Sequence, residues 1–174
     1  MAGSLKLNVD GSALSKPGPA GGGCICRDSN GNLVFAFAEG YESSLNNRAE
    51  LRALHDGLEL CISSGLLCVS IESDSKWVVD CINGRSSFAW KWKYWFSRIQ
   101  KLSLKGSFRC SLIPREANGP ADGLAKLGSS TQADSLVLQV SSLPRLLRGS
   151  FVPGPASILI PVNFWHINEM NLFL

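Results

Sequence analysis

The sequence is poor in histidine and lacks the cysteine spacing of a common zinc site. Among its 174 residues only His55 and His166 are histidines, and the six cysteines include a C-x-C pair, Cys24 and Cys26, but no C-x-x-C pair. We therefore do not expect zinc ligation, because structural zinc sites combine cysteine and histidine at characteristic spacings. The cysteines lie inside apolar runs, as small buried side chains do, and free thiols favour a reducing compartment.

The sequence also lacks a long apolar segment. Stretches such as SILIPV near the C-terminus are much shorter than the roughly 20 residues that a helix needs to cross a bilayer. The opening residues, MAGSLKLNVDGS, do not contain the apolar core of a signal peptide. We expect an intracellular protein, in the nucleus or the cytoplasm, that does not bind membranes.

Composition and length predict one globular domain of low net charge. The formal charge is +3, so overall electrostatics neither indicate nor exclude a nucleic-acid partner. With 45% hydrophobic residues, the chain is able to form a sizeable core. We expect residues 1–4 to be an extension and residues 5–129 to be the domain. In residues 130–174 no apolar period persists and four prolines occur, which predicts a poorly ordered tail.

The apolar pattern changes along the chain and predicts an α/β fold. Residues 5–40 alternate between apolar and polar positions around turns that contain glycine and proline, which predicts three antiparallel strands. From Asn46 to Ser64 the apolar period becomes helical, with Gly65 as a stop signal. A strand, further helices, a last strand and a last helix follow. This order predicts a mixed five-stranded sheet, three antiparallel strands and then two parallel ones, flanked by helices.

Four carboxylates lie at predicted strand ends or near the packed sides of helices, and not in turns or on solvent-facing sides. Asp10 ends the first strand, and Asp74 ends the fourth. Glu50 lies one turn before Leu54 and so faces the apolar stripe of its helix, while Asp122 lies beside the packed side of the last helix. An inward carboxylate is costly unless a cation meets it. Taken singly, Asp10 as a polar strand edge and Asp74 as a helix cap remain structural alternatives.

A cluster of these four acids would have a chemical use. Carboxylates gathered in one place repel one another, and hard oxygen ligands in that number suit a pair of magnesium ions. Two such ions about 4 Å apart activate a water molecule and stabilise the leaving oxygen of a phosphodiester. This hypothesis gives the strand-ending Asp10 a function.

Other polar and aromatic residues receive structural interpretations. We expect the polar side of the first helix to face solvent and to have no catalytic role. That side consists of Arg52, His55, Asp56 and Glu59. Between residues 86 and 106, tryptophans are interleaved with lysines and an arginine. We expect most of these tryptophans in the core, with the alternative that one or two are exposed and stack on a sugar or base.

Four segments together resemble the motifs of the type 1 ribonuclease H fold. The similarity is closest to the ribonuclease H-like domains of plant non-LTR retroelements and their domesticated relatives. The segments, in chain order, are LNVDGS, NNRAELRALHDGLEL, IESDSKWVVDCI and PREANGPADGLAKLG. The resemblance implies a magnesium-dependent endonuclease that hydrolyses the RNA strand of RNA/DNA hybrids, with manganese able to replace magnesium. We expect a monomer. Whether the chain originates from a larger reverse-transcriptase polyprotein is an open question.

The resemblance also implies roles for individual residues. The catalytic and metal-binding carboxylates would be Asp10, Glu50, Asp74 and Asp122. The nucleic-acid-binding residues would be Gly11, Ser12, Asn46 and Asn47. Glycine permits close backbone contact with the RNA strand and its 2′-hydroxyls, and short amides reach acceptors in the minor groove of the hybrid.

The chain departs from the family pattern at three places. The loop IPREANGPAD has no histidine, whereas bacterial and animal members usually have one there that assists proton transfer or product release. Arg115 or Glu116 would take its place, although neither titrates near neutrality. Position 45 is leucine instead of a threonine that helps to hold the DNA phosphate, and the separate basic protrusion is absent. Two alternatives are a non-catalytic module that binds nucleic acid or a partner, and an exonuclease on the same scaffold.

Overall fold

Turn residues between apolar strands fold the first part of the chain into an antiparallel meander. The structure, a computed structural model, describes residues 5–137 and 159–160. After the second strand, Asp28 accepts hydrogen bonds from the backbone N–H groups of Asn30 and Asn32, and Gly31 adopts a φ of 82°. The strands of the meander are β1 (Leu5–Ala13), β2 (Gly18–Arg27) and β3 (Leu33–Ser44).

Two parallel strands extend the sheet beyond β1. β4 (Cys68–Ser73) pairs with β1, and β5 (Ser107–Leu112) pairs with β4. The predicted mixed five-stranded sheet is therefore confirmed, in the order β5-β4-β1-β2-β3.

Two further strands, which the sequence did not predict, continue the sheet at the β3 edge. They are the short strands β6 (Ser135–Val137) and β7 (Leu159–Ile160). Both fall within the predicted tail. The rest of that tail after residue 137 lies outside the described residues, as does the predicted extension 1–4.

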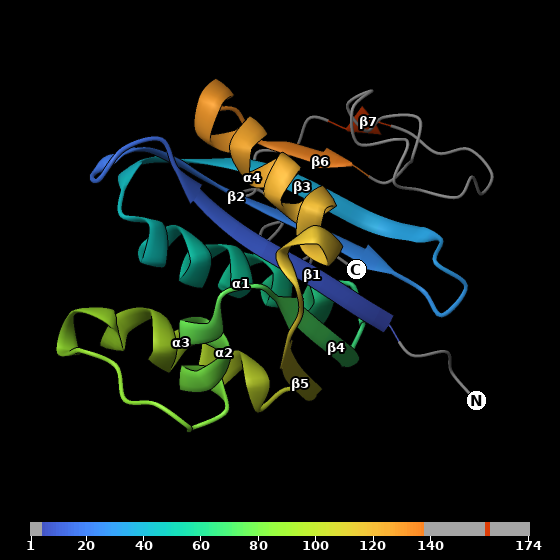
Figure 1. Cartoon of the computed structure of the whole chain (residues 1–174). Helices are drawn as coiled ribbons and strands as arrows, with labels where there is room; N and C mark the ends of the chain where they lie inside the picture. Colours follow the sequence, from blue (N-terminus) through green and yellow to red (C-terminus); the bar gives the residue numbers. More distant parts are fainter. Residues whose placement is uncertain (1–4, 138–158, 161–174) are drawn as a thin grey trace, which may run out of the picture.

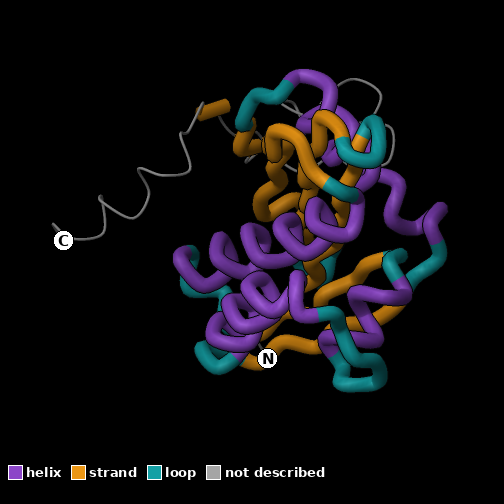
Figure 2. The backbone as a smooth tube through the Cα atoms, turned by 90° about the vertical axis from the view of Figure 1, so that its left-hand side faces the viewer, coloured by secondary structure: helices purple, strands orange, loops and turns teal. Residues whose placement is uncertain are grey.

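Helices cover both faces of the sheet (Figures 1 and 2). One helix, α4, lies on β2 and β3, while α1 packs on β1 and β2 from the other face with α3 beside it. Side chains alternate along β2, so Gly23 faces α4 and Cys24 faces the core below α1. The helices are α1 (Asn46–Ser63), α2 (Lys76–Ile82), α3 (Lys93–Ser103) and α4 (Gly119–Thr131), with 3₁₀ turns η1 (Trp90–Trp92) and η2 (Arg115–Asn118).

The larger core lies between the sheet and the helices α1, α2 and α3. Leu7 and Phe37 from the sheet and Phe96 from α3 are almost completely buried in it. The predicted apolar stripe of the first helix is confirmed, because its four members, Leu51, Leu54, Leu58 and Cys61, are all buried. Within the described ranges, no helix combines the length and the apolar character that crossing a membrane requires.

The strand β2 carries glycines where α4 crosses it. A methyl group at Gly23 would lie 2.3 Å from the backbone nitrogen of Ala125 and 2.4 Å from the carbonyl oxygen of Ala121. Both neighbours are backbone atoms that a rotamer change does not move. α4 therefore lies too close to the sheet for any side chain at this position, and this approach brings Asp122 within electrostatic range of Asp10.

We expect Gly23→Ala to lower the free energy of unfolding by about 1–3 kcal/mol, because α4 must move away from β2 to admit the methyl group. Gly119→Ala is the matched control, since a methyl group there meets nothing within 4 Å. The control should change stability by less than about 0.5 kcal/mol. Urea denaturation of both variants checks this, and wild-type stability of Gly23→Ala would contradict the close packing.

Candidate active site

The parallel pairing of β1 with β4 brings Asp10 and Asp74 near each other. Asn8 pairs with Glu72, and its side-chain amide donates to the Glu72 carboxylate at 3.0 Å. Beyond this pair β4 ends at Ser73, and Asp74 follows it directly, close enough for its charge to raise the pKa of Asp10. The prediction that Asp10 ends the first strand is wrong, because pairing with β2 continues β1 to Ala13.

The beginning of α1 contacts β1 at a glycine. A methyl group at Gly11 would lie 2.1 Å from the backbone nitrogen of Glu50, so only glycine allows this approach. Asn46, the first residue of α1, accepts a hydrogen bond from the Ala13 backbone N–H at 3.1 Å and so ties the helix start to the strand. This contact places the Glu50 carboxyl group within electrostatic range of Asp10.

Asn118, which the sequence did not single out, connects β1 to Asp74. It is fully buried, and its side-chain amide donates to the Val9 carbonyl at 3.0 Å and to Asp74 Oδ1 at 2.8 Å. The alternative role of Asp74 as a helix cap is not supported, since in the described structure α2 follows Ser75 with no side-chain cap. The sequence signal for Asn118 was its place in PREAN, directly before the helix that carries Asp122.

The predicted carboxylates interact with one another electrostatically. Burial, followed by the charges of Asp74 and Asp122, raises the pKa of Asp10 to about 7. Burial and the charges of Asp10 and Asp74 also raise the pKa of Glu50 well above its ordinary value. We call the part of the structure that contains Asp10, Glu50, Asp74 and Asp122 the acidic corner. The negative charges of these carboxylates repel one another, and a bound cation would relieve this repulsion.

Asp122 is paired with cations of its own chain. Lys126 Nζ lies 2.5 Å from one carboxylate oxygen, and Arg115 Nη2 lies 3.6 Å from the other. The positive charge of Arg115, in the loop without histidine, offsets part of the rise in the pKa of Asp10 and of Glu50. Within the described residues, no three of the four predicted carboxylates have their oxygens within 4.8 Å of one another. Their role as a shared metal site therefore stays a prediction.

Two observations test whether the corner fits a divalent cation. First, its donor set consists of carboxylate oxygens, the ligands that magnesium prefers. Second, among the described residues, Asn118 Oδ1 is a buried oxygen with no hydrogen-bond donor. A buried acceptor without a donor is a position that a cation or an ordered water completes. The residues present fit a divalent cation on both counts.

The predicted nucleic-acid-binding residues surround the same corner. Ser12 and Asn46 are half-buried, and Asn47 is exposed at the start of α1. Gly11 is buried, and the space left by its missing side chain is taken by the backbone of Glu50. Its lack of a side chain is thus explained by the packing of α1, and its contact with RNA stays a prediction.

A groove of about 460 Å³ lies beside the first turn of α1. It runs between the β3–α1 junction and the start of α3. Its walls are formed by Pro17, Ser43, Ser44, Leu45, Arg48, Lys91, Trp92, Tyr94 and Trp95. The tryptophans of this region differ in exposure, because Trp92 is 8% exposed whereas Trp90 is 87% exposed. The core interpretation holds for Trp92. Trp90 is exposed, and its stacking on a sugar or base stays a prediction.

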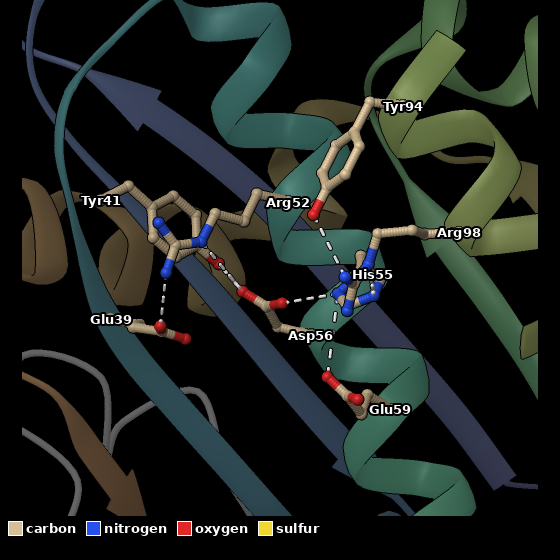
Figure 3. Close-up of polar contacts among 8 residues, drawn as sticks. All are labelled: Glu39, Tyr41, Arg52, His55, Asp56, Glu59, Tyr94 and Arg98. Carbon is tan, nitrogen blue, oxygen red and sulfur yellow. Dashed lines mark hydrogen bonds and ion pairs between the residues drawn. The ribbon is translucent and has the colours of Figure 1, made fainter. Parts of the chain in front are cut away.

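The prediction that the polar side of α1 faces solvent is wrong for two residues. His55 is 3% exposed and Asp56 is 8% exposed. α3 covers His55 (Figure 3), and Asp56 faces β3, where the Tyr41 hydroxyl donates to it. The Trp95 ring lies 5.5 Å from the imidazole in an edge-on arrangement, and Arg98 Nε donates to His55 Nε2 at 2.9 Å.

One group of possible metal-binding atoms in the described part of the chain lies within 4.8 Å of one another, and it belongs to His55, Asp56 and Glu59. Arginine is only a donor, so the bond from Arg98 makes His55 Nε2 the acceptor and leaves the proton on Nδ1. That N–H donates to Asp56 Oδ1 at 2.8 Å. A protonated nitrogen does not ligate a metal, so hydrogen bonding accounts for this cluster.

The fold and the acidic corner together define the class of protein. A mixed sheet in the order β3-β2-β1-β4-β5, with helices on both faces, is the ribonuclease H-like fold. Residues 8–128 match the family model described as reverse transcriptase-like. The chain is 30% identical over 148 residues to a ribonuclease H of Helicobacter pylori, covering 76% of this chain and 97% of that protein. The chain therefore belongs to the reverse transcriptase-like family of ribonuclease H-like proteins.

Two further similarities complete the comparison. A bifunctional protein of Mycobacterium tuberculosis is 31% identical over 136 residues, which cover 74% of this chain and only 36% of that protein. The chain thus spans about a third of that relative. The crystal structure of LC11-RNase H1, an enzyme isolated from compost, in complex with an RNA/DNA hybrid is 28% identical, with a TM-score of 0.68. It covers 73% of this chain and 97% of that one.

Without divalent cations, Asp10→Asn is expected to raise the free energy of unfolding above about pH 7 by about 1–3 kcal/mol. The Asp10 pKa is about 7 in the folded chain against an ordinary value of 3.8. Wild-type stability therefore falls as the pH rises between these two values, whereas an amide does not titrate. Urea denaturation in the presence of a chelator checks this. The advantage of the variant should disappear near pH 4, and a constant difference at all pH values would contradict it.

Proposed function

We propose that this chain is an endonuclease that hydrolyses the RNA strand of RNA/DNA hybrids, with magnesium, or manganese in its place, as the cofactor. The observation that carries the proposal is the meeting of Asp10, Asp74 and Glu50, with Asp122 nearby, at one edge of the sheet. Relatives that are named ribonuclease H, at about 30% identity, support it. The hybrid-bound structure of a similar protein supports the choice of substrate.

The four carboxylates would hold the cations through their oxygens. Bound divalent cations supply Lewis-acid activation of water and neutralise charge on the leaving oxygen. Asn118 orients Asp74 by donating to one of its oxygens. Lys126 and Arg115 pair with Asp122, so cation binding there competes with two ion pairs. Because the Arg115 guanidinium stays charged, it stabilises negative charge at this corner and does not transfer protons.

The first turn of α1 links the groove to the acidic corner. Leu45 and Arg48 line the groove, Asn46 and Asn47 lie between them in sequence, and Glu50 follows in the same helix. Arg48 and the nearby Lys91 supply positive charge for backbone phosphates. Exposed aromatic rings close by are suited to stacking on bases or sugars. A hybrid bound along this groove would therefore extend toward the carboxylates.

A second candidate function is a non-catalytic module that binds nucleic acid or a partner. The specific observation in its favour is Asp122 on α4, whose carboxylate is already paired with Lys126 of the same helix and with Arg115 of the preceding loop, which has no histidine. The affiliation with plant non-LTR retroelements rests on the sequence motifs and stays a prediction, as do the monomeric state and the intracellular location.

Asp10→Asn is expected to remove nearly all magnesium-dependent cleavage of a labelled RNA/DNA hybrid and to leave hybrid binding in place. Asparagine offers one neutral oxygen where the carboxylate offers two with a negative charge. Asp80→Asn, which changes a surface carboxylate paired with Lys76 and Arg85, is the matched control and should cleave like the wild type. If the wild type does not cleave the hybrid, or Asp10→Asn cleaves equally fast, the enzyme proposal fails and the binding module replaces it.

Substrate choice gives a separate prediction. The wild type should cleave the hybrid but not a DNA duplex of the same sequence, because Ser12, Asn46 and Asn47 are proposed to contact 2′-hydroxyls and the minor groove. Asn47→Ala should weaken hybrid binding roughly 2- to 10-fold, the loss expected for about one hydrogen bond. Equal cleavage of both duplexes would remove the specificity claim.

A further inference from the structure

A buried polar network joins α1 to α3 and to β3, and the acidic corner does not use it (Figure 3). His55 lies at its centre. The Nδ1–H of its ring donates to Asp56 Oδ1 at 2.8 Å, and its Nε2 accepts from Arg98 Nε at 2.9 Å. Because the two neighbours demand opposite hydrogen-bonding roles, the network selects the neutral ring with its proton on Nδ1.

Asp56 is held from its other side by β3 and by its own helix. Tyr41 donates its hydroxyl to Asp56 Oδ2 at 2.9 Å, and Arg52 Nε lies 3.5 Å from the same oxygen. Arg52 also donates to Glu39 Oε1 at 2.9 Å. With both oxygens engaged, the Asp56 carboxylate is not free to rotate. It therefore fixes the orientation of the His55 ring.

Arg98 connects this network to the groove. Its side chain is exposed, and its Nη1 donates at 3.1 Å to the hydroxyl of Tyr94, one turn earlier on α3. Tyr94 lines the groove together with Lys91 and Trp92. The Tyr94 side chain in the groove wall is thus hydrogen-bonded to Arg98, and Arg98 in turn donates to the Nε2 lone pair of His55.

We infer that His55 is a pH-sensitive positioning residue, which in its neutral form holds Arg98 and the groove wall in place for hybrid binding and on protonation releases them. The inference rests on the proposed function, since it assigns the groove to the hybrid. A protonated imidazole donates from both nitrogens, so Nε2–H would face the donor and positive charge of Arg98, and this bond would be lost.

The charged groups that face His55 act on a protonated ring in opposite directions. On α1, Asp56 and Glu59 face Nδ1, with the Glu59 carboxylate 3.9 Å away, and both favour the charged ring. Arg98 from α3 and Arg52 beyond Asp56 oppose it. From β3, Glu39 and Tyr41 act through Asp56 and Arg52. The side chain of Arg98 is exposed, so it is able to swing into solvent when the ring becomes charged.

The test compares hybrid affinity in the presence of a chelator at about pH 7.5 and about pH 5.5, two values on either side of the ordinary pKa of histidine side chains. His55→Gln keeps a carbonyl acceptor for Arg98 and does not titrate. We expect wild-type affinity to fall roughly 3- to 10-fold more than that of His55→Gln between the two pH values, as for the loss of about one hydrogen bond. Arg98→Met should bind weakly at both, without the histidine-dependent loss.

Turnover separates positioning from catalysis. At about pH 7.5, Arg98→Met should raise KM for the hybrid and leave kcat within about twofold, because the acidic corner is unchanged. Arg98 is exposed, so this variant keeps the test informative if His55→Gln does not fold. The inference is overturned if His55→Gln loses as much affinity on acidification as the wild type, or if Arg98→Met lowers kcat without raising KM.

A readout without hybrid distinguishes the two proposals. In a double-mutant cycle of His55→Gln and Arg98→Met, the melting shifts should deviate from additivity at about pH 7.5, and the deviation should change at about pH 5.5. If the wild type binds the hybrid but His55 and Arg98 show no pH-dependent coupling, the inference about His55 fails and the proposed function stands. If the wild type shows the coupling but never binds the hybrid, the proposed function fails, and the role of His55 in hybrid binding fails with it.

Discussion

The parallel register between β1 and β4 is the constraint on which the acidic corner depends. It pairs Asn8 with Glu72, two residues before Asp10 and Asp74, and a slip by one residue would turn every side chain of one strand to the opposite face. Apolar residues such as Leu7 and Ile71 hold the register, because both are buried in the same core. The packing of the core thus keeps two aspartates together, although burial and mutual repulsion raise the pKa of Asp10 to about 7.

Glycines extend this constraint from the strands to the helices. The backbone of α1 fits against Gly11 and the backbone of α4 fits against Gly23, so each helix approaches the sheet more closely than a side chain would allow. Glu50 and Asp122 are carried to the corner by these approaches. The sheet register and two backbone contacts therefore account for the placement of four acidic side chains from four different elements, before any metal ion is considered.

Sequence patterns predicted the features that depend on local periodicity. The apolar stripe of α1 and the position of Asp74 directly after β4 were of this kind, whereas Asp10 does not end β1, because pairing with β2 continues that strand to Ala13. Asn118 was missed because its partners, Val9 and Asp74, are distant in sequence and are contacted by an amide that no period identifies. His55 was placed in solvent because periodicity in one helix cannot show that a second helix, α3, covers its polar side.

The helix α1 serves two interfaces that are anchored differently. Near its start it is fixed to β1 by the backbone contact at Gly11 and by the bond between Asn46 and Ala13, neither of which titrates. Further along, its tie to α3 includes the bond between His55 and Arg98, which needs a neutral imidazole. A change in the protonation of His55 would therefore act on Arg98 and, through it, on the Tyr94 side chain in the groove wall, while the two contacts at the start of α1 stay in place.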